Sequence, residues 1–184
     1  MTLPLITFTG LAKRLGVTFP ALYKHVDGID SLRLLVAEEI FDRWELPPLD
    51  ADAADDVAEY LTTLAESLRE LVHRHPGIAW YLARVDTRTP VALRKIDQHH
   101  GQVAARYGFT PTQASWLLST VASHAVALAD TIYPTRDDRA REELTGRIDL
   151  PTLSRVAPSP ETAGFGLSMR ALVTGALAIV PELP

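Results

Sequence analysis

Apolar residues recur along this chain at steps of three and four positions, and no segment shows the sustained alternation of a β-strand. Such spacing places the side chains on one face of a helix. A helix is predicted near 53–74 from Val57, Leu61, Leu64, Leu68 and Leu71. A second is predicted near 28–45 from Ile29, Leu32, Val36 and Ile40. A third ends near Gly108 and has the apolar stripe Leu93, Ile96, His100, Val103 and Tyr107. The chain is therefore predicted to be all-α.

Two further helices begin at capping signals. Thr110-Pro111-Thr112-Gln113 combines a capping Thr, a Pro at the first helical position and the Gln of a capping box, and it predicts a helix near 110–133. Ser159-Pro160-Glu161 is a similar start for a helix near 161–180. Both are apolar on nearly all sides, so both need cover. We expect them to pack against their symmetry mates as the four-helix interface of a homodimer. The alternative is that both are core helices of a monomer.

The Pro47-Pro48 pair breaks the helical pattern and predicts a linker. It divides the chain into an N-terminal head, residues 1–46, and a helical body, residues 47–184. Within the body, residues 134–160 hold five Arg, five acidic residues and several Pro. This composition predicts a solvated loop with one short helix at about Asp137 to Leu144.

The stretch LAKRLGVTFPALYKHV, residues 11–26, predicts two short helices joined by a tight turn. Thr7 can cap the first helix, Gly16 permits the positive φ that ends it, and Thr18 can cap the second. The inward positions are predicted to be Leu11, Ala12, Leu15, Val17, Leu22 and Val26. The exposed side and its edges are left to Thr18, Phe19, Ala21, Tyr23, Lys24 and His25. A helix-turn-helix presents such positions to base edges and phosphates.

The head resembles the DNA-binding head of the tetracycline-repressor (TetR) family. The residues that carry the resemblance are Ile6-Thr7, Leu11-Ala12, Leu15-Gly16-Val17-Thr18, Ala21-Leu22-Tyr23-Lys24-His25-Val26 and Leu32. The body is similar to the effector-binding, dimer-forming domain of that family in the order of His75-Pro76, Tyr107-Gly108-Phe109-Thr110-Pro111 and Phe165-Gly166-Leu167. The resemblance covers essentially the whole chain.

The resemblance implies a transcriptional regulator, usually a repressor, that binds double-stranded operator DNA as a dimer. Its two recognition helices would enter successive major grooves roughly 34–36 Å apart, and an effector bound in the body would release the DNA. Tyr23 and His25 would contact phosphates, with Thr18, Phe19 and Lys24 near bases or backbone. The Tyr23 ring can also pack into the head while its hydroxyl reaches out.

The sequence departs from the family pattern in its head. Family members have a whole helix before the position of Thr7, and residues 1–6 are expected to be too few to form it. Thr9 and Gly10 stand where Arg is frequent, and Ile29 where a Lys commonly meets phosphate. Fewer phosphate contacts weaken binding to every DNA sequence. We therefore keep an alternative, a ligand-sensing dimer that has lost DNA binding through the shortened head.

The composition of the chain indicates how its charge is distributed and in which compartment it is expected. The net charge is −5, but residues 7–36 carry +2 and the remainder −7, which suits a nucleic-acid-binding head on an acidic body. Cysteine is absent, so disulfides and thiolate metal sites are excluded. The N-terminus lacks signal-peptide features, and the longest apolar run, near Ala171 to Pro181, is shorter than the about 20 residues of a membrane span. A cytoplasmic protein is expected.

Aromatic and His side chains in the body predict a pocket for a small, apolar effector. The predicted ligand contacts are Trp80, Tyr81, His100, Trp116 and His124. The alternative for each is an ordinary core position. His99 and His100 are adjacent and diverge on a helix, so no metal site is predicted, and neither is a cofactor. The resemblance implies that a tetracycline, bound with magnesium, would need a His on the helix after Pro76. Residues 77–90 hold no His, so a tetracycline ligand is not expected. No catalytic motif supports an enzyme.

Overall fold

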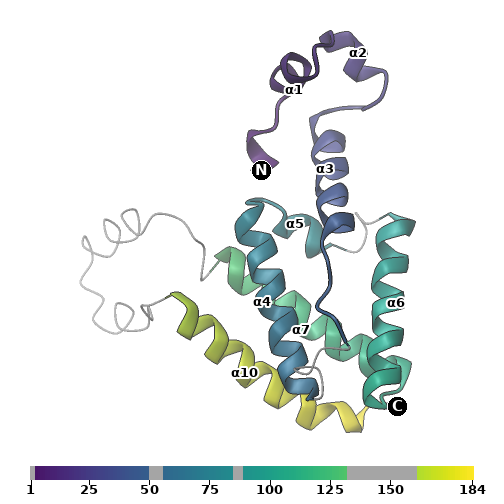
Figure 1. Cartoon of the computed structure of the whole chain (residues 1–184), viewed down its shortest axis with the longest axis vertical. Helices are drawn as coiled ribbons and strands as arrows, with labels where there is room; N and C mark the ends of the chain where they lie inside the picture. Colours follow the sequence, from purple (N-terminus) through teal and green to yellow (C-terminus); the bar gives the residue numbers. More distant parts are fainter. Residues whose placement is uncertain (1–2, 50–55, 85–88, 132–160) are drawn as a thin grey trace, which may run out of the picture.

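The protein is all-α in the computed structural model, which describes residues 3–49, 56–84, 89–131 and 161–184 (Figure 1). The helices follow the order η1 (Leu3–Leu5), α1 (Phe8–Leu15), α2 (Phe19–Tyr23), α3 (Ile29–Arg43), α4 (Val57–Arg74), α5 (Ala79–Leu82), α6 (Pro90–Tyr107), α7 (Pro111–Thr131), α10 (Glu161–Ile179) and η4 (Val180–Glu182). No strand is present in these ranges. The short helix predicted at Asp137–Leu144 and the cap at Ser159 lie outside the described residues.

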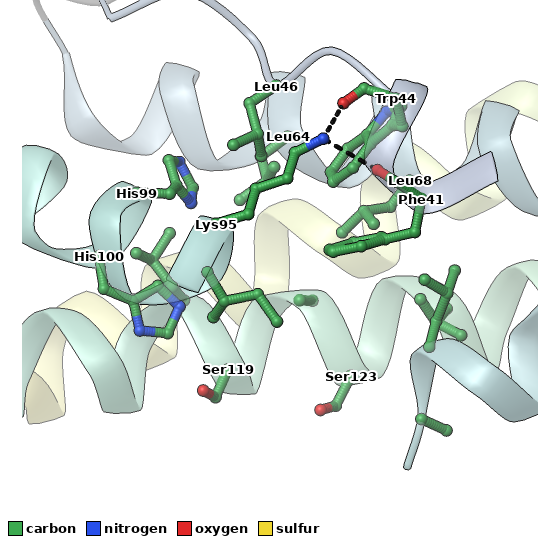
Figure 2. Close-up of a pocket in the computed structure, with 16 residues that line it drawn as sticks. Phe41, Trp44, Leu46, Leu64, Leu68, Lys95, His99, His100, Ser119 and Ser123 are labelled. Carbon is green, nitrogen blue, oxygen red and sulfur yellow. Dashed lines mark hydrogen bonds between the residues drawn. The ribbon is translucent and has the colours of Figure 1, made fainter. Parts of the chain in front are cut away.

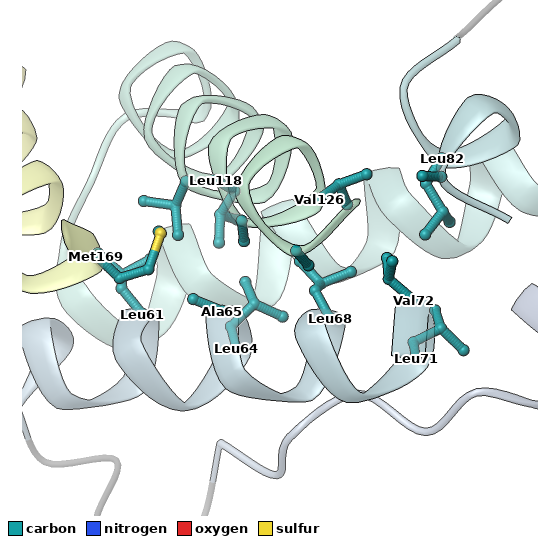
Figure 3. Close-up of a cluster of buried hydrophobic side chains, with 14 of the residues drawn as sticks. Leu61, Leu64, Ala65, Leu68, Leu71, Val72, Leu82, Leu118, Val126 and Met169 are labelled. Carbon is teal, nitrogen blue, oxygen red and sulfur yellow. The ribbon is translucent and has the colours of Figure 1, made fainter. Parts of the chain in front are cut away.

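The body is built around α4, which packs against α7 and α10, while α6 packs against α7 (Figure 1). The stripe that predicted α4 is the one that is buried, because Leu61, Leu64, Leu68 and Leu71 all lie in the core. Figure 3 shows Leu61, Leu64 and Leu68 facing Leu118 and Val126 of α7, with Met169 of α10 closing one end. Burial of these side chains from three helices is the main stabilising contribution to the body.

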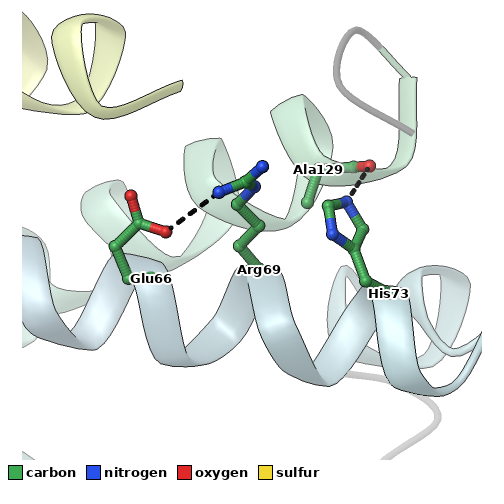
Figure 4. Close-up of polar contacts among 4 residues, drawn as sticks. All are labelled: Glu66, Arg69, His73 and Ala129. Carbon is green, nitrogen blue, oxygen red and sulfur yellow. Dashed lines mark hydrogen bonds and ion pairs between the residues drawn. The ribbon is translucent and has the colours of Figure 1, made fainter. Parts of the chain in front are cut away.

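Polar contacts mark the edge of this core where α4 meets α7 and α10. Nε2 of His73 lies 3.3 Å from the carbonyl oxygen of Ala129 on α7. The Arg69 guanidinium donates to Glu66 at 3.3 Å and lies 5.1 Å from the centre of the Phe165 ring on α10. Figure 4 shows Glu66, Arg69 and His73 along one side of α4. These contacts fix how α4 is rotated between its neighbours.

The predicted capping box at the start of α7 is confirmed, and it also holds the C-terminus. The backbone N–H of Gln113 donates to Oγ1 of Thr110 at 3.2 Å, and the backbone N–H of Thr110 donates to Oε1 of Gln113 at 3.0 Å. These are the two reciprocal bonds of the motif. The same two side chains donate to the carbonyl oxygens of Pro184 and Leu183. The chain end is thereby fixed beside the start of α7.

The head is a small layer of two short helices above α3 (Figure 1). Oγ1 of Thr7 accepts from the Gly10 N–H at 3.1 Å, as expected of a cap. Gly16 ends α1 with φ 68° and ψ 27°, the left-handed geometry predicted for it. Thr18 precedes α2 with extended backbone but makes no side-chain capping bond. A separate apolar cluster fills the layer, formed by Phe8, Ala12, Leu22 and Leu32.

Two inward positions predicted in the head are wrong. Leu15 is 59% exposed and Val17 is 43% exposed. Because α2 has only five residues and ends at Tyr23, it covers Ala12 but does not extend over the end of α1. Among the described residues before Thr7, Leu3–Leu5 form a single 3-10 turn, η1. Leu3 of that turn is buried in the body core, and its N–H donates to the Pro76 carbonyl at 3.0 Å.

The predicted stripe of α6 is rotated from the observed one. Leu93 is 41% exposed, and His99 is buried where His100 was expected. The buried positions of this helix are Ala92, His99, Val103 and Ala104. Helix α6 covers α7 with a narrow face, so the choice between two adjacent histidines depends on the rotation of the helix and not on hydropathy.

One helix in the described part of the chain is long and apolar enough to cross a membrane. The segment Gly164–Glu182 has a mean hydropathy of 1.4. The expectation of no segment of sufficient length is therefore wrong, because Arg170 interrupts the apolar run without ending it. Phe165, Met169, Val173 and Ala176 on this segment are buried against α4 and α7. These contacts bury one face of the helix, and 33% of its apolar window is buried in all.

Candidate functional site

A cavity of about 140 Å³ lies where α3, α4, α6 and α7 meet (Figure 2). Its walls are mostly apolar, with Phe41 and Trp44 from α3 and its end, Leu64 and Leu68 from α4, and Ile96 from α6. The polar groups that line it are Lys95, His99, His100, Ser119 and Ser123. Both serines are exposed and therefore lie at its rim. None of the described residues that line the cavity is acidic.

Lys95 joins the cavity to the C-terminal end of α3. Its ammonium donates to the carbonyl oxygens of Phe41, Asp42 and Trp44 at 2.9, 2.7 and 2.6 Å. Three acceptors require the three N–H groups of the protonated amine. The last carbonyls of a helix have no partner within it, and a cation there is favoured by the helix dipole. Lys95 of α6 is thus a side-chain cap for α3 (Figure 2).

The environment of Lys95 combines burial with opposite charge. Burial lowers the pKa of the ammonium below its ordinary value, and the carboxylates of Asp42 and Glu45 offset part of that effect. The ammonium also lies 5.3 Å from the centre of the Phe41 ring, within the range of a cation–π contact. Its charge is therefore held between the ring and the three carbonyls.

A second contact joins α6 to α3 at the start of α6. Oγ1 of Thr89, the N-cap residue of α6, donates to Oε1 of Glu38 in the middle of α3. The same Thr89 oxygen accepts from the Ala92 N–H. The first turns of α6 therefore contact α3 at two places. Thr89 contacts Glu38 in the middle of α3, and Lys95 contacts the C-terminal end of α3.

Trp44 follows α3 at the junction between head and body. Its indole Nε1–H donates to Oγ of Ser67 on α4 at 3.0 Å. Its ring lies 5.8 Å from that of Phe41, which in turn contacts the buried Tyr81 at 6.2 Å. The end of α3 is therefore held by α4 on one side and by Lys95 of α6 on the other.

His99 is the buried histidine of the cavity wall. Its Nε2 lies 2.7 Å from the hydroxyl oxygen of Tyr60 on α4. Burial, with a smaller contribution from the adjacent His100, lowers the pKa of His99 to about 4. Burial also raises the pKa of Tyr60, with a smaller contribution from Tyr107. Both side chains are accordingly neutral around neutral pH, and their hydrogen bond ties α4 to α6.

The structure separates the predicted ligand contacts. His100 lines the cavity, half-buried. Tyr81 is fully buried in the core, and Trp80 is 40% exposed beside it. Trp116 and His124 do not line the cavity but an open groove along α7, which shares Ser119 and Ser123 with the cavity rim. The aromatic residues that do line the cavity are Phe41 and Trp44, at the end of α3. For all five predicted residues, ligand contact stays a prediction.

Lys95 is the cavity residue that sequence reasoning missed. The sequence contains a second helical stripe, Ala92, Ile96, His99 and Val103, with steps of four, three and four, and Lys95 lies beside it. The prediction used the alternative stripe through Leu93 and His100, which does not place Lys95 near the core. The partners of Lys95 are carbonyl groups, which leave no trace in the residue pattern.

The predicted DNA contacts lie together at the exposed end of the head. Thr18, Phe19, Tyr23, Lys24 and His25 are all exposed. Phe19 and Tyr23 are nevertheless fixed by Phe8, whose ring stacks on Tyr23 at 4.7 Å and meets Phe19 edge-on at 5.6 Å. Both roles considered for Tyr23, ring packing and an accessible hydroxyl, are compatible with this geometry.

No group of three or more His, Cys, Asp or Glu that could hold a metal ion occurs among the described residues. Comparison with protein families and with curated proteins found no match for this chain. The functional interpretation therefore depends on the residues themselves and on the geometry described above.

Proposed function

We propose that this protein is a TetR-like transcriptional regulator, in which a small molecule bound in the body cavity controls the binding of operator DNA by the head. The mode suggested by the family resemblance is repression, relieved by the effector. The proposed DNA contacts are Thr18, Phe19, Tyr23, Lys24 and His25. The effector would occupy the cavity between α3, α4, α6 and α7.

The observation that carries this proposal is that α3 belongs to both the head and the body. Leu32, in its first turn, lies in the apolar cluster of the head, while Ala37 and Phe41 lie in the core of the body. Phe41 also lines the cavity. A displacement of the end of α3 by a ligand would thus be carried by one continuous helix to the head (Figure 1). Coupling between two sites needs such a shared element.

The chemistry of the head supports a nucleic-acid partner. Lys13, Arg14 and Lys24 are exposed, and cations at such positions can neutralise phosphates. The side chain of Thr18 is exposed as well and makes no capping bond to α2. The stacked rings of Phe8, Phe19 and Tyr23 give these residues a rigid base.

The outer faces of α7 and α10 support a homodimer. Ser115, Ser119, Ser123 and Ala127 form an exposed row of small side chains on α7. Leu167, Ala171, Gly175 and Ala178 form an exposed, mostly apolar row on α10. Small residues allow two helices to approach closely, and apolar rows favour burial. A dimer through these rows would be a four-helix interface.

One observation favours the second function, a ligand-sensing dimer that does not bind DNA. Leu15, Val17 and Phe19 are 59%, 43% and 46% exposed on the head. Exposed apolar side chains close together suit a protein contact better than a phosphate contact. In this alternative the cavity and the dimer are retained, and the head binds a protein or another part of the assembly.

An electrophoretic shift with the DNA upstream of the gene that encodes the protein tests the first function. The expected result is a salt-sensitive complex, because neutralised phosphates release counterions. Lys24→Ala is expected to weaken it at every sequence. Arg94→Ala, which removes an exposed charge from α6 outside the head, is the matched control and should bind as the unmodified protein does. No shift at low salt, from a protein that is folded and dimeric, would favour the second function.

A further inference from the structure

We propose that the cavity binds a small apolar molecule with one anionic group, such as an aromatic or aliphatic carboxylate. We propose further that this group draws the Lys95 ammonium away from the carbonyls at the end of α3. The inference rests on the proposed function for its effect on DNA, and it extends that function by the ligand class and the contact that the ligand changes. The sequence predicted a small apolar effector, and the geometry of the cavity adds that the effector carries one negative charge.

The charge of the cavity wall points to the anion. Lys95 is the cation among the described lining residues, and no carboxylate lines the cavity to neutralise it. Asp42 and Glu45 act on Lys95 from exposed positions. The imidazoles of His99 and His100 lie on the same helix beside Lys95 (Figure 2) and can donate an N–H to a bound oxygen. One fixed positive charge matches one carboxylate.

The size and apolar walls of the cavity limit the rest of the molecule. An apolar cavity of roughly 150 Å³ in another protein holds one benzene molecule, and this cavity has about 140 Å³. Phe41, Leu64 and Leu68 provide flat and branched apolar surface for a ring or a short chain. A benzoate-sized ligand fits this space, with its ring against the leucines and its carboxylate toward Lys95.

The effect on α3 follows from the number of protons on the ammonium. All three are engaged by Phe41, Asp42 and Trp44. A carboxylate can bind Lys95 at close range only if at least one of these bonds is released. A charged acceptor forms a stronger hydrogen bond than a neutral carbonyl does, which offsets the loss of the bond to α3. The last carbonyls of α3 then lose their cap.

Ligand binding is tested on the protein without DNA by isothermal titration calorimetry, which leaves Trp80 and Trp116 unchanged. The probes are benzoate and its neutral analogue benzamide. Benzoate is expected to bind about 10- to 100-fold more tightly, the range of a charge-assisted hydrogen bond. Lys95→Met, which keeps the apolar stem, is expected to abolish this preference, while Lys95→Arg retains part of it. Arg94→Met, a charge removal on the exposed side of α6, should leave it intact.

Equal affinity for benzoate and benzamide, binding of neither, or a preference that survives in a folded Lys95→Met protein would overturn the ligand class. Circular dichroism shows that each variant is folded. Release of α3 is measured by hydrogen exchange of the Trp44 amide, which donates to Ile40 and Phe41. Benzoate is expected to speed this exchange at least several-fold, and an unchanged rate would overturn the release.

The DNA measurement separates failure of this inference from failure of the proposed function. If operator DNA binds and benzoate lowers its affinity in the unmodified protein but not in Lys95→Met, the coupling through Lys95 is supported. If benzoate binds with the expected charge preference but no DNA is bound, the ligand class stands and the regulator proposal is wrong. If DNA binds but benzoate does not, the ligand class is wrong and the regulator proposal stands.

Discussion

The hydroxyl oxygen of Tyr60 lies 2.7 Å from Nε2 of His99, and this hydrogen bond joins α4 to α6 inside the body. The imidazole is neutral in the folded protein around neutral pH, because burial lowers the pKa of His99 to about 4. The contact sits beside the cavity, since His99 also lines it. Stability of this part of the fold is therefore linked to pH.

We expect the free energy of unfolding to fall as the pH decreases from about 6.5 to about 4. In this window the unfolded chain binds a proton at His99 and the folded chain does not, so acid favours unfolding. The contribution is fully present above the unfolded pKa and amounts to at most ~3 kcal/mol. Burial lowers the pKa of His75 as well, which acts in the same direction.

Urea unfolding at several pH values measures this dependence. His99→Gln should be less stable at pH 7 and should lose part of the slope between pH 4 and 6.5. His124→Gln, a substitution at an exposed position on α7, is the control and should keep the slope. An unchanged slope in a folded His99→Gln protein would contradict the assignment of this acid sensitivity to His99.

Leu61→Ala is expected to destabilise the body strongly. Leu61 is 0% exposed and packs in the core next to Met169 (Figure 3). The loss of its side chain leaves a cavity, and such changes cost about 2–5 kcal/mol. Leu167→Ala on α10, where the side chain is 62% exposed, should change the free energy of unfolding by less than about 0.5 kcal/mol if measured on the monomer. Equal effects of the two substitutions would show that the core is not packed as described.

Gly16→Ala and Gly101→Ala are expected to have opposite effects. Gly16 has φ 68°, which an alanine adopts at a cost of about 1 kcal/mol. Gly101 lies inside α6 with no atom near the added methyl group, so alanine there should stabilise the helix by about 0.5–1 kcal/mol. Thermal unfolding measures both. A neutral or stabilising Gly16→Ala would mean that the turn between α1 and α2 differs from the left-handed geometry.

Much of this fold could be predicted from spacing and capping residues, because these act locally. The stripe of α4, the turn at Gly16 and the capping box at Thr110 depend on residues within one or two helical turns. The rotation of α6 could not be predicted, since His99 and His100 are adjacent and equivalent until α4 is in place with Tyr60. The exposure of Leu15 and Val17 depends on how far α2 extends, which the pattern of the stretch 11–26 does not fix.

The candidate site was less predictable than the fold for the same reason. The residues that line its cavity come from α3, α4, α5, α6 and α7, and they extend from Phe41 to Val126. Lys95 acquires its role from the backbone carbonyls of Phe41, Asp42 and Trp44, and carbonyl groups are present at every residue. Trp80 and Trp116 were predicted as ligand contacts by residue type; they do not line this cavity, and their contact with a ligand stays a prediction.

Ala171→Glu is expected to convert a dimer into a monomer. Ala171 is exposed in the middle of the outer row of α10, and a buried carboxylate without a partner is costly. Sedimentation should then give the mass of one chain, 20.2 kDa. Ala105→Glu, at an exposed position of α6, is the control and should leave the dimer intact. A protein that is monomeric without any substitution, or that stays dimeric with Ala171→Glu, would argue against the interface through α7 and α10.

Substitution of Tyr23 by Phe and by Ala can separate its two roles in the head. Its ring stacks on Phe8 at 4.7 Å, and the side chain is 48% exposed. Tyr23→Phe keeps the ring, so stability should change by less than about 0.5 kcal/mol, while the loss of a hydroxyl–phosphate bond should weaken DNA binding about tenfold. Tyr23→Ala also removes the stacked pair and should cost about 1–2 kcal/mol of stability.

The two variants are compared by thermal unfolding and by DNA titration at fixed salt. If Tyr23→Phe binds DNA as tightly as the unmodified protein and Tyr23→Ala does not, the residue serves only to pack the head. If both variants keep full affinity while Lys24→Ala does not, the DNA is held through the basic residues alone. The contact assigned to the Tyr23 hydroxyl stands only if Tyr23→Phe weakens DNA binding without lowering stability. This substitution removes the hydroxyl oxygen alone and keeps the ring, so it affects the phosphate contact and not the packing.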